Sequence, residues 1–180
     1  ELLFHLTLRD VKIRYKQAVL GVLWAILSPL ILMVVFTLVF SKAAGITGDG
    51  IPYPVFSYSA LLPWTLFATG MRQASMSLLG NQALIKNIYF PREVLPASGV
   101  LASVFDFLIA SVILFGMLLY YGYPPTWAYV WLPVLILLLL ALAMAIGLLL
   151  SALNVSFRDV KYVVPLGLQV WMYLTPIIYP

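Results

Sequence analysis

The sequence predicts an all-α, polytopic membrane protein. Of its 180 residues, 64% are hydrophobic and only 9% are charged, and the mean hydropathy is +1.07. Soluble domains are nearer half apolar and a quarter charged. The few charged residues are grouped, so that they leave five apolar runs, each long enough to cross a bilayer as a helix. No soluble domain of any size fits between these runs.

The chain begins with a basic segment, residues 1–18, that is expected to form an amphipathic helix. At helical spacing one side carries Phe4, Leu8, Val11, Tyr15 and Ala18, and another carries His5, Arg9, Lys12 and Lys16. A helix of this kind, placed directly before an apolar run, is typical of one that lies along a membrane surface. A simple positive anchor on the inner side explains the same charges.

Five segments are expected to span the membrane: residues 19–40, 55–79, 96–121, 127–153 and 162–180. The second contains one charged residue, Arg72, and the third contains one, Asp106. The fourth is free of charge and places Ala143, Gly147 and Ser151 at four-residue intervals. A stripe of small residues lets two membrane helices approach closely.

The polar hairpin at residues 81–95 lies between the second and third spans. A short helix that ends at Pro91 fits the apolar spacing of Leu84, Ile85 and Ile88, and the chain re-enters the membrane near Pro96. Most polar connections are plain solvated loops. A plain loop has no need of so many apolar and aromatic side chains, and we therefore interpret the hairpin as a docking element.

The positions of lysine and arginine predict the orientation. The N-terminal segment carries four, the hairpin two and the 154–161 connection two, whereas the opposite connections carry only Lys42. The positive-inside rule then places the N-terminus, the hairpin and the 154–161 connection in the cytoplasm. Tyrosine and tryptophan gather toward the outer ends of the spans, which is typical of an interfacial belt and would also suit a carbohydrate path.

The sequence shows no chemistry of its own. It has no phosphate-binding loop motif, no cluster of metal ligands, no nucleophile with a base, no cysteine, and a single histidine, His5. The chain therefore offers a membrane path without an energy source, and energy is expected to enter from a separate protein at the hairpin.

Several stretches carry a resemblance to a known family. They are residues 8–16 (LRDVKIRYK) running into 20–24 (LGVLW) and Pro29, residues 62–64 (LPW), residues 84–93 (LIKNIYFPRE) with Pro96, residues 157–159 (FRD) and residues 175–179 (TPIIY). In this order they resemble the ABC-2 type membrane subunits that export lipid-linked polysaccharides. The resemblance runs nearly end to end, and the hairpin and N-terminal stretches are its most specific parts.

The resemblance implies one ABC-2 type transmembrane domain over residues 1–180, in the bacterial cytoplasmic membrane. It implies a homodimer of six-span subunits bound to two copies of an ATPase subunit, which holds the ATP and Mg, while this chain binds no cofactor and no nucleic acid. Residues 1–18 would be an interface helix. The family's re-entrant segment and sixth span would follow Pro180, so the sequence is expected to be C-terminally incomplete. The coupling residues that dock on the ATPase would be Leu84, Ile85, Lys86, Asn87, Tyr89, Phe90, Pro91, Arg92 and Glu93.

The resemblance predicts a transport subunit without an ATPase site of its own. The cargo would be an O-antigen, a teichoic acid or a capsule-type polymer on a polyprenyl lipid. One alternative is an ABC-2 exporter of drugs or small lipids. Another is a membrane enzyme acting on polyprenyl phosphates, against which the missing catalytic constellation argues.

Two groups of charged residues are candidate sites within this chain. Arg9, Lys12, Arg14 and Lys16 are expected to attract lipid headgroups and the substrate phosphate. Arg72 and Asp106 lie at similar depths on small or polar helix faces and are expected to pair, or to share a polar network, because a lone charge in lipid is costly. The alternative leaves Arg72 in the substrate pathway. Arg158 and Asp159 mark the second cytoplasmic loop.

Overall fold

The computed structural model describes residues 1–16, 23–43, 45, 50–87, 89–123, 126–157 and 159–177, which form helices joined by short turns. The elements are α1 (Leu2–Lys16), α2 (Leu23–Phe36), η1 (Thr37–Ala43, a π-helical turn), α3 (Tyr53–Gly80), α4 (Gln82–Asn87), α5 (Val94–Tyr120), η2 (Trp127–Trp131, a 3-10 turn), α6 (Leu132–Ser156) and α7 (Val160–Leu174). The predicted all-α class is confirmed.

Three helical stretches within the described residues are long and apolar enough to cross a membrane: Leu23–Ser41, Val94–Tyr120 and Trp127–Ser156. They correspond to the first, third and fourth predicted spans. The second predicted span forms helix α3, and the fifth forms helix α7 only as far as Leu174. Residues 19–22 of the first predicted span and 178–180 of the fifth lie outside the described residues. Helix α3 has 28 residues and α7 has 15, and both are more polar than the other three.

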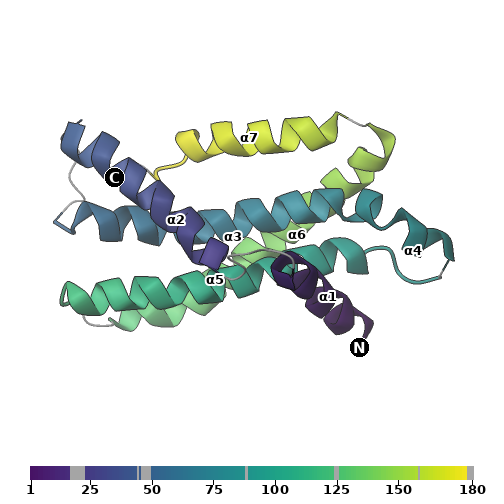
Figure 1. The fold of residues 1–180 in the computed structure, drawn as a ribbon, viewed down its shortest axis with the longest axis horizontal. Helices are drawn as coiled ribbons and strands as arrows, with labels where there is room; N and C mark the ends of the chain where they lie inside the picture. Colours follow the sequence, from purple (N-terminus) through teal and green to yellow (C-terminus); the bar gives the residue numbers. More distant parts are fainter. Residues whose placement is uncertain are drawn as a thin grey trace.

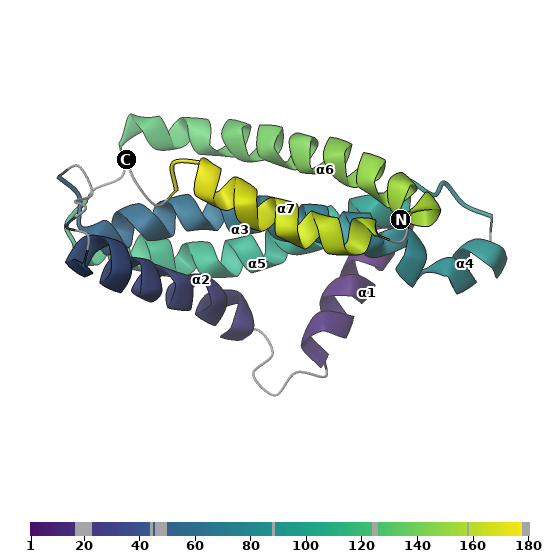
Figure 2. The same cartoon turned by 90° about the horizontal axis from the view of Figure 1, so that it is seen from above.

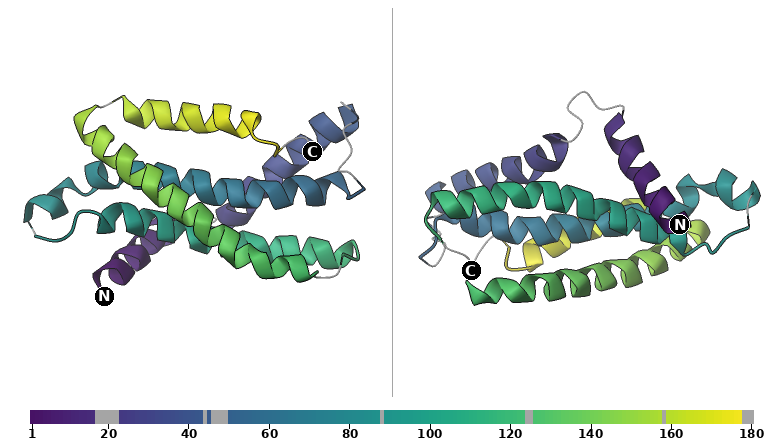
Figure 3. Two further views of the ribbon diagram at one scale, coloured as in Figure 1. Left: turned by 180° about the vertical axis from the view of Figure 1, so that it is seen from behind. Right: turned by 90° about the horizontal axis from the view of Figure 1, so that it is seen from below.

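Helix α3 is the centre of the fold. It runs antiparallel to α5, and α6 crosses this pair diagonally in the view from behind and forms a separate layer in the view from below (Figure 3). Helices α2 and α7 also pack on α3 (Figures 1 and 2). Because protein surrounds α3 on several sides, many of its polar side chains face other helices rather than lipid, which explains its lower apolar content.

Small residues bring α3, α5 and α6 into close contact. A Cβ atom added to Gly147 of α6 would lie 2.6 Å from the Cβ of Ala74 on α3. One added to Gly99 of α5 would lie 3.2 Å from backbone atoms of α3. Ala143, Gly147 and Ser151 are all buried, so the predicted small-residue contact of the fourth span is confirmed.

Aromatic side chains fill the space between α3 and α7. Trp171 lies edge-on to Phe67, with ring centroids 5.3 Å apart, and to Trp64 at 6.2 Å. Both distances are typical of favourable aromatic pairs. Beside them lies a cavity of about 260 Å³ between α3, α6 and α7. The contact of α7 with the bundle is therefore made by bulky side chains rather than by a small-residue seam.

The polar segments gather at one end of the bundle. Helix α1, helix α4, the end of α6 and the start of α7 lie toward the right in Figure 1, and η1, the start of α3 and the end of α5 lie at the opposite end. In this second group the turn after α5 contains Gly122 with a φ of 74°, a conformation that glycine adopts readily. The grouping matches the separation of charges on which the predicted orientation depends.

Candidate functional site

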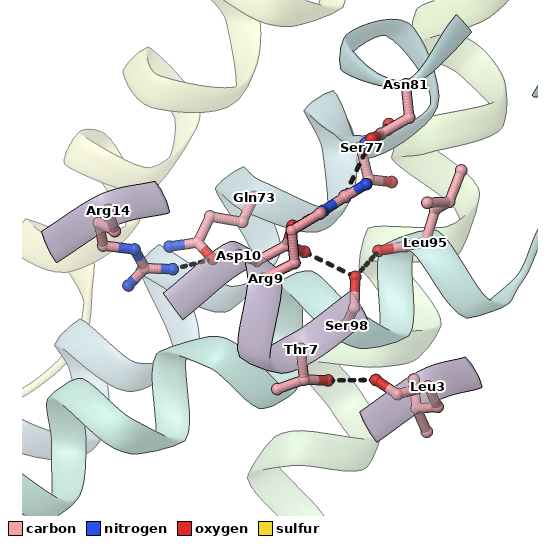
Figure 4. A network of polar contacts seen from close by, with 10 residues as sticks. All are labelled: Leu3, Thr7, Arg9, Asp10, Arg14, Gln73, Ser77, Asn81, Leu95 and Ser98. Atoms are coloured by element: carbon pink, nitrogen blue, oxygen red, sulfur yellow. Dashed lines mark hydrogen bonds and ion pairs between the residues drawn. The ribbon is translucent and has the colours of Figure 1, made fainter. Parts of the chain in front are cut away.

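Helix α1 packs against the bundle, and its polar side chains contact residues of α3, of α5 and of the turn between α3 and α4. Arg9 donates to the Asp10 carboxylate at 2.8 Å and to Asn81 Oδ1 at 2.9 Å. Ser98 Oγ, near the start of α5, lies 2.8 Å from the other Asp10 oxygen. Asn81 in turn donates to the Ser77 carbonyl oxygen at 2.8 Å. The network thus joins α1 to both ends of the polar hairpin (Figure 4).

A second set of contacts lies one turn further along α1. Arg14 forms an ion pair with Asp106 of α5 and donates to Gln73 Oε1 of α3 at 2.5 Å. Tyr15 also donates its hydroxyl hydrogen to Asp106. Burial and the neighbouring Asp106 carboxylate raise the pKa of the Tyr15 hydroxyl, so Tyr15 stays protonated and remains the donor at every physiological pH.

These contacts form one wall of a cavity of about 320 Å³ between α1, α2, α3 and α5. Its remaining polar lining includes hydroxyl groups from Ser28, Thr65, Thr69 and Ser103. Arg14 and Asp106 carry the formal charges of the lining and are opposite in sign. The cavity therefore has a polar part that is close to neutral, within a lining that is otherwise apolar.

The predicted pair between Arg72 and Asp106 is wrong. Asp106 is engaged by Arg14 and Tyr15, whereas Arg72 is exposed on α3. The prediction compares only the depths of Arg72 and Asp106 along their two spans, and these depths are similar. It does not consider α1, which places Arg14 and Tyr15 at the same depth as Asp106. The other prediction for Arg72, a place in the substrate pathway, stays a prediction.

The four basic residues of α1 divide into two pairs. Arg9 and Arg14 direct their N–H groups to the bundle, whereas Lys12 and Lys16 are exposed. The headgroup expectation therefore remains a prediction for the two lysines.

The predicted helix at the N-terminus is confirmed over Leu2–Lys16, and residues 17–18 of the prediction lie outside the described residues. The side that packs on the bundle, however, is centred on Leu6 and Thr7, and Phe4 and Ile13 point outward at 64% and 63% exposure.

The hairpin projects beyond the end of the bundle (Figure 2). The predicted short helix is present as α4, but it ends at Asn87 rather than at Pro91, and Ile88 lies outside the described residues. Leu84, Ile85 and Phe90 are half-buried, and Tyr89 is fully exposed. A pocket of about 210 Å³ is lined by Ile85, Lys86, Asn87, Tyr89, Phe90 and Arg92. Pro91 and Glu93 are exposed on the return to α5.

The second polar connection contributes less to any site. Asp159 is exposed, and its backbone carbonyl accepts hydrogen bonds from the first turn of α7 at 2.9 and 3.0 Å. Arg158 lies outside the described residues. Nearby on α6, Asn154 is buried and donates to the Ser75 carbonyl oxygen of α3 at 2.8 Å. This bond holds α6 to α3 close to the hairpin.

Sequence reasoning missed the uncharged partners of the network. Gln73, Asn81 and Ser98 hold Arg14, Arg9 and Asp10, yet single amides and hydroxyls are common in helices of every kind. Their only signal is position: Asn81 is the first residue of the hairpin, and Gln73 and Ser98 lie in the helices on either side of it. Among the described residues no group of three or more histidine, cysteine, aspartate or glutamate side chains is placed to hold a metal ion.

Comparison with known proteins identifies the family. The sequence profile of the ABC-2 type transporter family matches residues 1–180. The O-antigen export system permease protein RfbA of Myxococcus xanthus is 34% identical over 180 residues, covering 99% of this chain and 68% of that protein. The protein of the same name from Klebsiella pneumoniae is 33% identical over 181 residues, covering 99% and 69%. With its apolar, membrane-length helices, the chain belongs to the ABC-2 type transporter family of membrane proteins.

Proposed function

We propose that this chain is the membrane-spanning subunit of an ATP-driven exporter for a lipid-linked polysaccharide of the O-antigen, teichoic acid or capsule type. The main support for this proposal is that the chain, along almost its whole length, is 33–34% identical to permeases named for O-antigen export. The chain contributes the path, and ATP with Mg is bound and hydrolysed by a separate subunit.

The proposed topology has five spans, with the N-terminus in the cytoplasm of a bacterial cell. Helices α3 and α7 cross the membrane together with α5, α6 and the α2–η1 stretch. At 28 residues α3 is about 42 Å long, more than the hydrocarbon core requires. Because α3 packs against α2, α5, α6 and α7, its polar residues need not face lipid. The gathering of the basic segments at one end supports the orientation.

Helix α1 is proposed to lie at the inner membrane surface. Its outward side carries the exposed apolar residues Phe4 and Ile13 together with the exposed bases Lys12 and Lys16. Apolar and basic side chains on one helix suit the boundary between acyl chains and anionic headgroups, where each base contributes roughly 1 kcal/mol. The inward side, with Arg9 and Arg14, fixes the helix to the bundle.

The hairpin is proposed to dock on the ATPase subunit, in a complex containing two copies of each chain. Tyr89 is fully exposed beside the pocket lined by Ile85 and Phe90. An exposed aromatic side chain beside a pocket with apolar and polar walls is the kind of residue that dominates binding at protein interfaces. The exposed charges of Lys86, Arg92 and Glu93 would surround it as a polar rim.

Substitution of Tyr89 tests the docking proposal. Tyr89→Ala and Phe90→Ala are each expected to weaken association with the ATPase by about 2 kcal/mol, or roughly thirtyfold in Kd. The matched control is Tyr120→Ala, which removes an exposed tyrosine at the opposite end of the bundle. Pull-down of the ATPase from detergent-solubilised membranes measures the effect. Wild-type association in both hairpin variants would contradict docking at this site.

Depletion of the protein in its native cells tests the cargo. Lipid-linked polysaccharide is expected to disappear from the cell surface and to accumulate on the inner side of the cytoplasmic membrane. Extraction of the glycolipid and surface staining of the polymer measure both pools. An exporter of drugs or small lipids would leave both pools unchanged, and that result would reject the polysaccharide assignment.

A further inference from the structure

Arg72 of α3 has no counter-charge among the residues that the structure describes. Within the described parts of α2, α3, α5 and α6, the charged side chains are Arg72 and Asp106. Asp106 is neutralised by Arg14 and receives a further hydrogen bond from Tyr15. Arg14 of α1 is therefore paired with the carboxylate that could have neutralised Arg72.

The other acidic residues of the described chain do not replace Asp106. Asp10 is paired with Arg9, and no carboxylate of the described residues lies within 4.0 Å of the Arg72 guanidinium. Asp49 lies outside the described residues. The side chain of Arg72 is exposed on the bundle surface, so its N–H donors are accessible to whatever surrounds the protein there.

The position of Arg72 on α3 is at the edge of a polar strip. Thr65 and Thr69, which precede it by seven and three residues, line the cavity of about 320 Å³ and share its side of the helix. On the other flank Ala68 and Ser75 are buried in helix contacts. Eight residues, or about 12 Å, separate Arg72 from the end of α3 at Gly80. This places the guanidinium below the hairpin, in the inner part of the proposed span.

A charge in this position requires an anion or water. An arginine in the hydrocarbon region is costly unless it is paired or faces a polar space. Its planar guanidinium binds carboxylate and phosphate through two parallel hydrogen bonds, and it is weakly hydrated, so it suits phosphate recognition at a membrane interface. A neutral sugar ring or an acyl chain would leave the charge unmatched.

We propose that Arg72 binds a phosphate group in the inner part of the membrane, and that this phosphate is the one linking the polysaccharide to its lipid carrier. The assignment of the phosphate to the cargo rests on the proposed function. The same chemistry is offered by anionic phospholipids, and the experiment below distinguishes the two sources. Arg72 is thus a binding residue, whereas Arg14, of the same residue type, is structural.

The test is direct binding to the purified permease–ATPase complex in phosphatidylcholine nanodiscs. The probe is undecaprenyl diphosphate, and undecaprenol, which has the same chain without phosphate, is the neutral control. Native mass spectrometry after release of the complex measures the bound lipid. Arg72→Gln is expected to weaken undecaprenyl diphosphate binding roughly tenfold or more and to leave undecaprenol binding unchanged. Arg72→Lys keeps the charge without the paired hydrogen bonds and is expected to lie between the wild type and Arg72→Gln.

Lys161→Gln is the matched control, because it removes an exposed positive charge from the start of α7, and it is expected to bind both lipids as the wild type does. Unchanged undecaprenyl diphosphate binding by Arg72→Gln, or an equal loss of undecaprenol, would overturn the proposal. Displacement of the probe by an equal amount of phosphatidylglycerol, in an Arg72-dependent way, would assign the residue to bulk lipid and overturn the cargo assignment. If the proposed function were wrong, the result would be different. Binding of the probe would still depend on Arg72, but depletion of the protein in cells would leave the surface polymer unchanged.

Discussion

At the scale of single residues, Asp106 joins α5 to α1 through two contacts. It accepts from both Arg14 and Tyr15, so one carboxylate of α5 holds two consecutive residues of α1. The side chains of Arg14 and Asp106 are 28% and 23% exposed, so neither is freely solvated. Loss of the carboxylate leaves a partly buried guanidinium and a partly buried hydroxyl without their shared acceptor.

We expect Asp106→Asn to destabilise the protein by about 1–3 kcal/mol, the range for losing a charge-assisted hydrogen bond in a partly buried site. Arg14→Gln should destabilise it similarly, and the double variant should lose less than the sum because the two side chains interact directly. Thermal unfolding in detergent measures each. Arg72→Gln serves as control and should leave the melting temperature unchanged. Coupling of Asp106 to Arg72 instead of Arg14 would contradict the observed pairing.

The same residues show where sequence reasoning reaches its limit. Single charges in apolar helices are conspicuous, so Arg72 and Asp106 both stand out in the sequence as unusual. The partner of Asp106, however, is 92 residues away in the chain and belongs to a helix outside the apolar spans. Depth along two neighbouring helices is available from spacing, whereas the folding back of a surface helix depends on tertiary contacts that spacing does not contain.

At the scale of elements, the helices themselves follow closely from the sequence. The span predicted at residues 96–121 corresponds to α5 at Val94–Tyr120, and the span predicted at residues 127–153 corresponds to η2 with α6, which cover Trp127–Ser156. Prolines, glycines and charged residues at both ends of a long apolar run define closely where its helix begins and ends. The inward side of α1 is harder to predict, because its contacts are polar and a hydrophobic period does not mark them.

The contact between α3 and α6 gives a prediction about element packing. Gly147→Ala should destabilise the protein by about 1–3 kcal/mol, because its new Cβ would lie 2.6 Å from that of Ala74. Gly167→Ala on α7 is the matched control, since nothing lies within 4 Å of its added Cβ, and it should be neutral or slightly stabilising. Thermal unfolding compares the two. Restoring space with Ala74→Gly should recover part of the loss in Gly147→Ala, and a failure to recover any would mean that the contact is not the cause.

At the scale of the whole molecule, the two ends of the bundle are expected to face opposite sides of the membrane. The sequence has no cysteine, so single introduced thiols report on topology without background from these residues. Ser156→Cys, at the end of α6, should react only with a thiol reagent that reaches the cytoplasm. Ile51→Cys, exposed before α3, should react with an impermeant reagent added to intact spheroplasts. The reverse labelling pattern would invert the proposed orientation.

The small-residue seam between α3, α5 and α6 also bears on how such a protein changes shape. A Cβ atom added at Gly147 or Gly99 would lie only 2.6–3.2 Å from atoms of α3. These helices are therefore too close to slide past one another. Helices α2 and α7 are different, because they meet α3 through larger side chains, and cavities of about 320 and 260 Å³ lie between them and the α3, α5 and α6 bundle. We therefore expect α3, α5 and α6 to move as one rigid body during a transport cycle, while α2 and α7 rotate relative to it.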